Sequence, residues 1–228
     1  MKAPIVISVG GSLVVPKTGI DVVFLKSFKK LIVDLVKKGY RFVIVVGGGT
    51  TARQYQAAAR GVGKLALDDV DWLGIHATRL NGHLMRTILR DVAHPIMIKD
   101  PTRSIGNWKE SVLIVAGWKP GWSTDYVAMR LAKKVKAKLV INLSNIDYVY
   151  TKDPKKFKDA KKIEQIAWKD FRKMVGDTWS PGMNVPFDPI ASRFADQQRL
   201  TVAIINGLNL KNLKALVRDK KWIGTKIG

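Results

Sequence analysis

Short runs of apolar residues recur along the chain, and several are separated by segments with the spacing of amphipathic helices. The runs are IVISV (5–9), RFVIVV (41–46), HPIMI (94–98), VLIVA (112–116), KLVINL (138–143) and TVAIIN (201–206). Continuous runs of Val and Ile that alternate with helices are typical of a parallel sheet buried on both faces. The pattern therefore predicts an α/β fold in which a mostly parallel sheet is sandwiched between helices.

The segment 21–38 has the clearest helical pattern. Its apolar residues recur at i, i+3 and i+4, and the lysines between them would face solvent. Gly39 follows the last turn, where glycine commonly ends a helix. The predicted buried stripe is Val22, Leu25, Phe28, Ile32 and Leu35.

The pattern indicates one domain over residues 1–228, with a soft boundary near residue 115 and no linker. Residues 99–111 are the least regular stretch and form a plausible excursion between two strands. Residues 148–166 are polar and rich in lysine, which favours a loop or a hairpin lying over the second half. We therefore expect two lobes, about 1–115 and about 116–228, that share one sheet.

Three glycine-bearing turns follow apolar runs: residues 10–12 (GGS), 47–49 (GGG) and 117–123 (GWKPGWS). Glycine lets backbone N–H groups approach phosphate oxygens, and a helix N-terminus adds partial positive charge. Arg53 lies one turn into the helix after the second turn, where its planar fork could bind a phosphate. A single such turn is more often only tight, but three in one sheet favour nucleotide or phosphate chemistry. Neither the P-loop motif nor G-x-G-x-x-G is present.

Charge and cysteine content narrow the classes of function. The chain has 40 basic and 18 acidic residues, a net charge of +22, and such a field attracts nucleotides and nucleic acids. The same lysines could equally be the solvated faces of ordinary helices. The absence of cysteine excludes disulfides and thiolate metal sites and fits a cytoplasmic protein. No run approaches the roughly 20 apolar residues of a membrane span, and the three histidines lack metal-ligand spacing, so we expect neither a membrane anchor nor a protein-built metal site.

Several longer blocks occur together in an order that resembles a known family. They are GGSL, VVGGGTTAR, DWLGIHATRLNG, PGWSTDYVA, NLSNIDYVYTKDPKK, FDPIAS and INGLNLKNLKALVRDKKWIGTKI, spread from about residue 5 to 227. They resemble the amino-acid kinase fold, and most of all its uridylate (UMP) kinase branch of the archaeal-like type. The resemblance implies transfer of the γ-phosphoryl group of ATP to UMP, giving UDP in pyrimidine nucleotide biosynthesis. It also implies Mg²⁺ carried on the substrate phosphates, a homo-oligomer (a hexamer), a UMP-binding first lobe and an ATP-binding second lobe.

The resemblance also implies roles for individual residues. Arg53 would lie where the donor and acceptor phosphates meet, and Asp188 would orient the catalytic site. Asp71 would bind the ribose of UMP, although an aspartate there could also merely cap a helix. The remaining acceptor residues would be Gly47, Trp118, Lys119, Pro120, Gly121, Trp122, Ser123 and Thr124. The residues at ATP would be Gly10, Gly11, Ser12, Gly48, Arg53, Ser144, Asn145, Tyr150 and Asp153.

Some positions depart from the family pattern. Many members have lysines where this chain has Ser8 and Asn142, so we expect a substitute cation, with Lys17 and Lys152 as candidates. Trp118 and Trp122 replace smaller or more polar residues; they would either stack on uracil or fill the interface between the lobes. Tyr148 replaces a glycine and would narrow the adenine side of the site.

Two other functions stay open at this stage. One is a kinase of the same fold that acts on acetylglutamate or isopentenyl phosphate, whose pocket would not need the ribose-binding Asp71. The other is a catalytically weak scaffold that binds nucleic acid through its charge, although no RNA-binding aromatic motif is evident.

Overall fold

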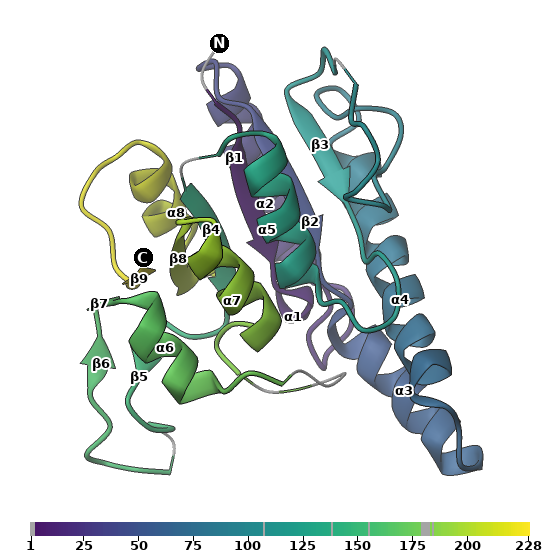
Figure 1. Cartoon of the computed structure of the whole chain (residues 1–228). Coiled ribbons are helices and arrows are strands. Elements are labelled where there is room, and N and C mark those ends of the chain that lie inside the picture. The colour runs from purple at the N-terminus through teal and green to yellow at the C-terminus, as the bar shows by residue number, and fades with distance from the viewer. Residues whose placement is uncertain (1–2, 107, 138, 155, 179–182, 184) are drawn as a thin grey trace.

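The computed structural model describes residues 3–106, 108–137, 139–154, 156–178, 183 and 185–228 and is built around one seven-stranded sheet (Figure 1). The order across the sheet is β3-β2-β1-β4-β8-β9-β7. These strands are β1 (Ile5–Val9), β2 (Phe42–Val46), β3 (Val112–Val115), β4 (Leu139–Ser144), β7 (Gln165–Ile166), β8 (Thr201–Asn206) and β9 (Thr225–Ile227). Two further strands, β5 (Val149–Tyr150) and β6 (Lys162–Ile163), pair with each other in a separate antiparallel ladder.

Among the described residues, the five strands from β3 to β8 run parallel, and β9 runs antiparallel to its neighbour β8. The predicted mostly parallel sheet is therefore confirmed. β1 connects the two halves of the chain, because it pairs with β2 on one side and with β4 on the other. In this register Ser8 lies opposite Val45 on one side and Asn142 on the other.

Helices cover both faces of the sheet, because side chains along each buried strand alternate between two apolar layers. Ile7 and Val9 point into the layer formed with α2 and α8, and Val6 points into the layer formed with α5, α6 and α7. α3 and α4 pack against each other, and α4 also contacts β2 and β3. The helices are α1 (Gly11–Val14), α2 (Val22–Val36), α3 (Gly49–Val62), α4 (Leu67–Ile88), α5 (Thr124–Lys134), α6 (Trp168–Val175), α7 (Pro189–Gln197) and α8 (Leu210–Val217).

The predicted helix over 21–38 is confirmed as α2. Asp21 caps it by accepting a hydrogen bond from the Phe24 amide at 2.8 Å, and Gly39 ends it with a φ of +80°, a conformation that favours glycine. The predicted burial was wrong for one residue of the stripe, Val22. Val22 is 54% exposed, since it begins the helix, before the first turn that reaches the sheet.

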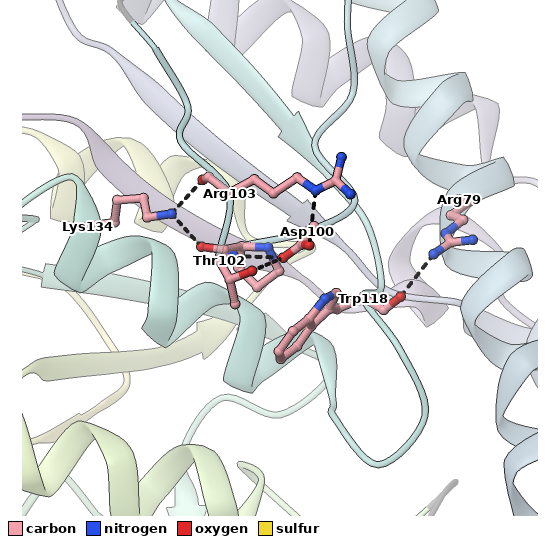
Figure 2. Close-up of polar contacts among 7 residues, drawn as sticks. Arg79, Asp100, Thr102, Arg103, Trp118 and Lys134 are labelled. Carbon is pink, nitrogen blue, oxygen red and sulfur yellow. Dashed lines mark hydrogen bonds and ion pairs between the residues drawn. The ribbon is translucent and has the colours of Figure 1, made fainter.

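The run HPIMI (94–98) was predicted as a strand, and this was wrong. Within this segment only Ile98 forms an isolated bridge with β3, and a second bridge precedes it at Ala93. Pro95 has no N–H to donate to a ladder, which weakens regular pairing there. The irregular stretch that follows is instead fastened by Lys134 at the end of α5, which donates to the carbonyls of Pro101 at 2.7 Å and Arg103 at 2.6 Å (Figure 2).

The lysine-rich segment 148–166 contains the β5–β6 hairpin, in line with the prediction of a loop or hairpin. Among the described residues, none of the helices is both long and apolar enough to cross a membrane. The division into two lobes near residue 115 stays a prediction, since the sheet continues without a break from β3 to β7.

Candidate active site

The three glycine turns come together because each follows the carboxyl end of a parallel strand. β1, β2 and β3 are adjacent in the sheet, so the turns after them lie along the same edge. The first two turns touch through their backbones: a Cβ atom on Gly11 would lie 2.0 Å from the Gly49 nitrogen. No residue but glycine fits this contact. In Figure 1, α1 lies at this edge, with the β5–β6 region on one side and the α3–α4 pair on the other.

Arg53 connects the first two turns through side chains. One guanidinium nitrogen donates to the Thr50 hydroxyl at 2.9 Å and to the Ser12 hydroxyl at 3.3 Å. The residue is exposed and lines a cavity between α3, α4 and the third turn. The Gly10 amide, in contrast, already donates to the Leu143 carbonyl at 2.9 Å. That amide is therefore part of the fold and is not directed at a ligand.

The cavity beside Arg53 contains much of the predicted acceptor site. Its volume is about 190 Å³, below the roughly 300 Å³ at which ligand pockets usually begin. Of the predicted acceptor residues, Asp71, Trp122, Ser123 and Thr124 line it, whereas Gly47, Trp118, Lys119, Pro120 and Gly121 are not among its lining residues. Gly48, predicted at ATP, lines this cavity as well.

Side chains of α4 hold the third glycine turn by its backbone. Thr78 accepts a hydrogen bond from the Gly117 amide at 2.7 Å, and Arg79 donates to the Trp118 carbonyl at 2.9 Å (Figure 2). Asp71 accepts a hydrogen bond from the Gly121 amide at 2.8 Å. Residues 78 and 79 follow residue 71 by seven and eight positions, about two helical turns, so all three lie toward one face of the helix. These three contacts fix the turn against the cavity.

The same helix also positions the second turn. Asn81, which is buried, donates from its amide to the carbonyls of Gly47 at 2.9 Å and Gly48 at 3.1 Å. Thr78, Arg79 and Asn81 belong to the TRLNG block, which the sequence singled out without giving these residues a role. The available signal in the sequence was the presence of three polar residues within four positions of one block that the family resemblance contains.

The two tryptophans belong to a row of stacked rings. Trp122 stacks on Tyr126 with ring centres 4.2 Å apart, and Trp118 contacts Trp122 at 5.8 Å. Tyr126 in turn meets Phe194 edge to face at 5.5 Å. Trp122 also lines the acceptor cavity, so it both packs and faces that cavity. The contacts of Trp118 are those of a packing residue, with Lys119 above its ring at 4.5 Å.

A larger cavity of about 660 Å³ lies beyond the ends of β4 and β5. Four predicted ATP residues line it, namely Ser144, Asn145, Tyr150 and Asp153. Lys152 lines it too and forms an ion pair with Asp159 at 2.7 Å. Lys17 is exposed in the loop after α1 and is not among the residues that line this cavity or the acceptor cavity.

An acidic group, which the sequence analysis did not select, lies where the family often has lysines. The Asp125 carboxylate accepts hydrogen bonds from the Ser8 hydroxyl at 3.0 Å and from the Asn142 amide at 2.9 Å, both on the same oxygen. Desolvation and the nearby charge of Asp188 raise the pKa of Asp125 to about 7. Its place in the first turn of α5, directly after the third glycine turn, was the available signal.

Asp188 begins α7 and is 4% exposed. One carboxylate oxygen caps the helix by accepting a hydrogen bond from the Ala191 amide. The other is buried and has no hydrogen bond of normal geometry among the described residues, although interaction with the Ser123 hydroxyl lowers the pKa of this carboxyl. Burial raises the pKa of Asp188 to about 6. The neighbouring carboxylates of Asp188 and Asp125 supply oxygen ligands of the kind that a hard cation such as Mg²⁺ prefers. No cluster of three or more potential metal ligands occurs among the described residues.

Comparison with known proteins gives consistent results. Residues 3–206 match the model of the amino acid kinase family. A uridylate kinase of Hyperthermus butylicus is 36% identical over 222 residues, covering 95% of this chain and 94% of that protein. A uridylate kinase of Methanococcus maripaludis strain C5 is 33% identical over 219 residues, with 94% and 96% covered.

Solved structures share the fold over the whole chain. Uridylate kinase from Archaeoglobus fulgidus has a TM-score of 0.83 at 30% identity, with 99% of this chain and 100% of that chain covered. UMP kinase from Bacillus anthracis, at 20% identity, shares the fold with a TM-score of 0.80.

The acidic pair predicts an unusual dependence of stability on pH. An acid whose pKa is higher in the folded than in the unfolded protein stabilises the fold at low pH. That stability is lost as pH rises from the unfolded value of about 4 to the folded values of about 6 and about 7. Asp125→Asn should therefore raise the free energy of unfolding at pH 8 by more than about 1 kcal/mol and flatten this decline.

Urea unfolding measured from pH 4.5 to pH 8 checks this expectation. Asp69→Asn, on the exposed surface of α4, is the matched control and should follow the wild-type profile. Parallel profiles for Asp125→Asn and the wild type would show that Asp125 carries no ionisation penalty.

Proposed function

The chain belongs to the amino acid kinase family, and within it we propose that the protein is a UMP kinase that transfers the γ-phosphoryl group of ATP to UMP and forms UDP. The observation that carries the proposal is the arrangement of two cavities. One lies at β5 and the other at α4, and the touching glycine turns with Arg53 lie at the sheet edge they share. Phosphoryl transfer in line needs two nucleotides whose phosphates face each other.

We place ATP in the larger cavity, with adenosine against Tyr150 and the ribose near Asp153. UMP would occupy the smaller cavity, with its ribose hydroxyls on Asp71 and its base beside Trp122. Because Asp71 already accepts from the Gly121 amide, its second oxygen is the one directed to the ribose. The small volume of this cavity means that side chains lining it must shift as UMP enters.

In the reaction a phosphate oxygen of UMP attacks the γ-phosphorus of ATP, and the bond from that phosphorus to the bridging oxygen of ADP breaks. Arg53 would orient both phosphates, because its fork lies between the first glycine turn and the acceptor cavity. The Gly11 turn excludes side chains and lets the phosphates approach the backbone. Mg²⁺ carried on the substrate phosphates would supply neutralising charge, and Asp188, together with Asp125 in its ionised form, would hold it or its water shell.

Ser8 and Asn142 supply no positive charge, so cations must reach the phosphates from elsewhere. Ser8 and Asn142 instead donate hydrogen bonds to Asp125. The raised pKa of Asp125 lowers the negative charge that two incoming nucleotides would meet near pH 7. We propose Lys152 as the substitute cation, since it lines the donor cavity. Lys17 is the second candidate.

The family resemblance and the composition suggest the setting. We propose a cytoplasmic homo-oligomer, a hexamer by resemblance, because the chain lacks cysteine and exposes large apolar side chains on α3 and α4. Examples are Tyr55, Val62, Leu67 and Leu80, which are between 62% and 90% exposed. A scaffold that binds nucleic acid through its +22 charge is the second candidate function.

One assay tests the proposed activity against its rivals. The full chain is incubated with ATP and Mg²⁺ and with UMP, CMP, acetylglutamate, isopentenyl phosphate or no acceptor, and nucleoside diphosphate formation is coupled to a spectroscopic readout. We expect turnover with UMP well above that with the non-nucleotide acceptors. RNA binding with steep salt dependence and no turnover would favour the scaffold, and a preference for acetylglutamate or isopentenyl phosphate would favour another kinase.

Asp71→Asn separates the two nucleotide sites. Losing a charged hydrogen-bond partner costs about 1.5–3 kcal/mol, so the KM for UMP should rise roughly ten- to hundred-fold. The KM for ATP should change little. Asp69→Asn, exposed in the first turn of α4, is the control and should leave both values unchanged. Equal increases for the two substrates would remove Asp71 from the UMP site.

Lysine substitutions test the source of the missing charge. Lys152→Ala should lower kcat by about a hundred-fold or more, because a preorganised donor at a transferring phosphoryl group contributes about 2.7–4 kcal/mol. Lys17→Ala is measured beside it. Lys37→Ala, on the exposed end of α2, is the control. If both candidates match the control, neither lysine replaces the charge that is absent at Ser8 and Asn142.

A further inference from the structure

A second cavity borders the proposed ATP cavity, and two tyrosine rings separate them. The neighbouring cavity measures about 470 Å³ and is lined by Asp147, Tyr148, Tyr150, Ala160, Lys162, Asn209 and Ile223. Tyr148 and Tyr150 line the 660 Å³ cavity as well. Among the described residues they are the two that line both cavities, so we place the partition between the cavities at their rings.

The geometry of the β5–β6 hairpin explains the partition. Tyr148 directly precedes β5 and Tyr150 ends it, and the two rings meet edge to face with centres 6.5 Å apart. Lys162 pairs with Tyr150 across the ladder and places its ammonium 5.0 Å above the Tyr148 ring. Glu164 holds that ammonium at 2.7 Å. The Tyr148 ring is therefore packed on two sides.

The backbone around Tyr148 is fastened on both sides of the residue. The preceding Asp147 accepts a hydrogen bond from the Asn206 side chain at 3.0 Å. The following Val149 is fully buried, and its amide donates to the Thr225 hydroxyl at 2.8 Å. A change confined to the Tyr148 ring would thus alter the partition without releasing the strand.

We propose that Tyr148 is a specificity-determining residue that closes the base end of the donor pocket and limits the size of the purine that the donor can carry. The inference rests on the proposed placement of ATP in the 660 Å³ cavity. An aromatic ring at this place does two things at once: it offers a stacking or edge contact to a purine, and it blocks the 470 Å³ space behind it. Removing the ring would join the two cavities.

The test combines Tyr148→Ala, which removes the ring, with Tyr148→Phe, which keeps the ring and loses only the hydroxyl. Both variants and the wild type are assayed for UDP formation with ATP and with base-enlarged donors, namely N6-benzyl-ATP, 2-methylthio-ATP and 8-bromo-ATP. The KM for UMP and the midpoint of thermal unfolding are measured in parallel.

For Tyr148→Ala we expect the KM for ATP to rise by about ten-fold, as for loss of one base–aromatic contact, with the KM for UMP unchanged. At least one enlarged donor should gain about ten-fold in kcat/KM relative to ATP, the scale on which pockets reject one extra group. Tyr148→Phe should behave like the wild type. A purely structural role cannot produce such a gain with larger donors.

The outcomes distinguish this inference from the proposed function. If the wild type forms UDP but no enlarged donor gains in Tyr148→Ala, the specificity inference is overturned and the kinase proposal stands. If the wild type forms no UDP, the kinase proposal falls, and calorimetric binding of the same four nucleotides tests the partition directly. An unchanged order of affinities in Tyr148→Ala would then overturn it.

Discussion

The arrangement of the active site depends on one close contact between two backbones. The first glycine turn meets the second with no room for a side-chain atom on Gly11 or Gly49. Because these turns end two neighbouring parallel strands, the contact holds the start of α3 against the start of α1. Arg53 then lies within reach of Ser12, and the acceptor cavity opens beside it. A side chain at either glycine would separate the turns and alter the sheet edge at which the two proposed nucleotide sites meet.

The chain as a whole is strongly basic, but the polar group between the ends of β1 and β4 contains an acid and no basic side chain. The chain has 40 basic residues, yet its strand ends carry the neutral Ser8 and Asn142, which hold an acid. Lysines at these positions would keep Asp125 ionised as their counter-ion. Neutral donors leave its charge to be decided by burial and by Asp188, so it titrates close to neutral pH. Binding of nucleotide phosphates in the proposed site would therefore be coupled to proton uptake at Asp125.

Much of this could be predicted from the sequence, and the reasons for success and failure are physical. Alternation of Val and Ile runs with helices identified the parallel sheet, and α2 followed from spacing and its terminal glycine. The run 94–98 was mistaken for a strand because it is apolar, although Pro95 cannot donate in a ladder. Asp125 and Asn81 were missed because their partners lie at least 17 positions away, and no local pattern reports such contacts. The occupation of the Gly10 amide by Leu143 likewise depends on the pairing of β1 with β4.

The clamp that α4 applies to the third glycine turn has an evolutionary consequence. Thr78, Arg79 and Asp71 grip only backbone atoms of that turn, at residues 117, 118 and 121. The backbone of the turn is thus held by the helix independently of side chains such as Lys119, while Trp118 and Trp122 add packing. Such a division would let substitutions accumulate in the turn and alter which acceptor the proposed site recognises, while the backbone geometry is inherited intact.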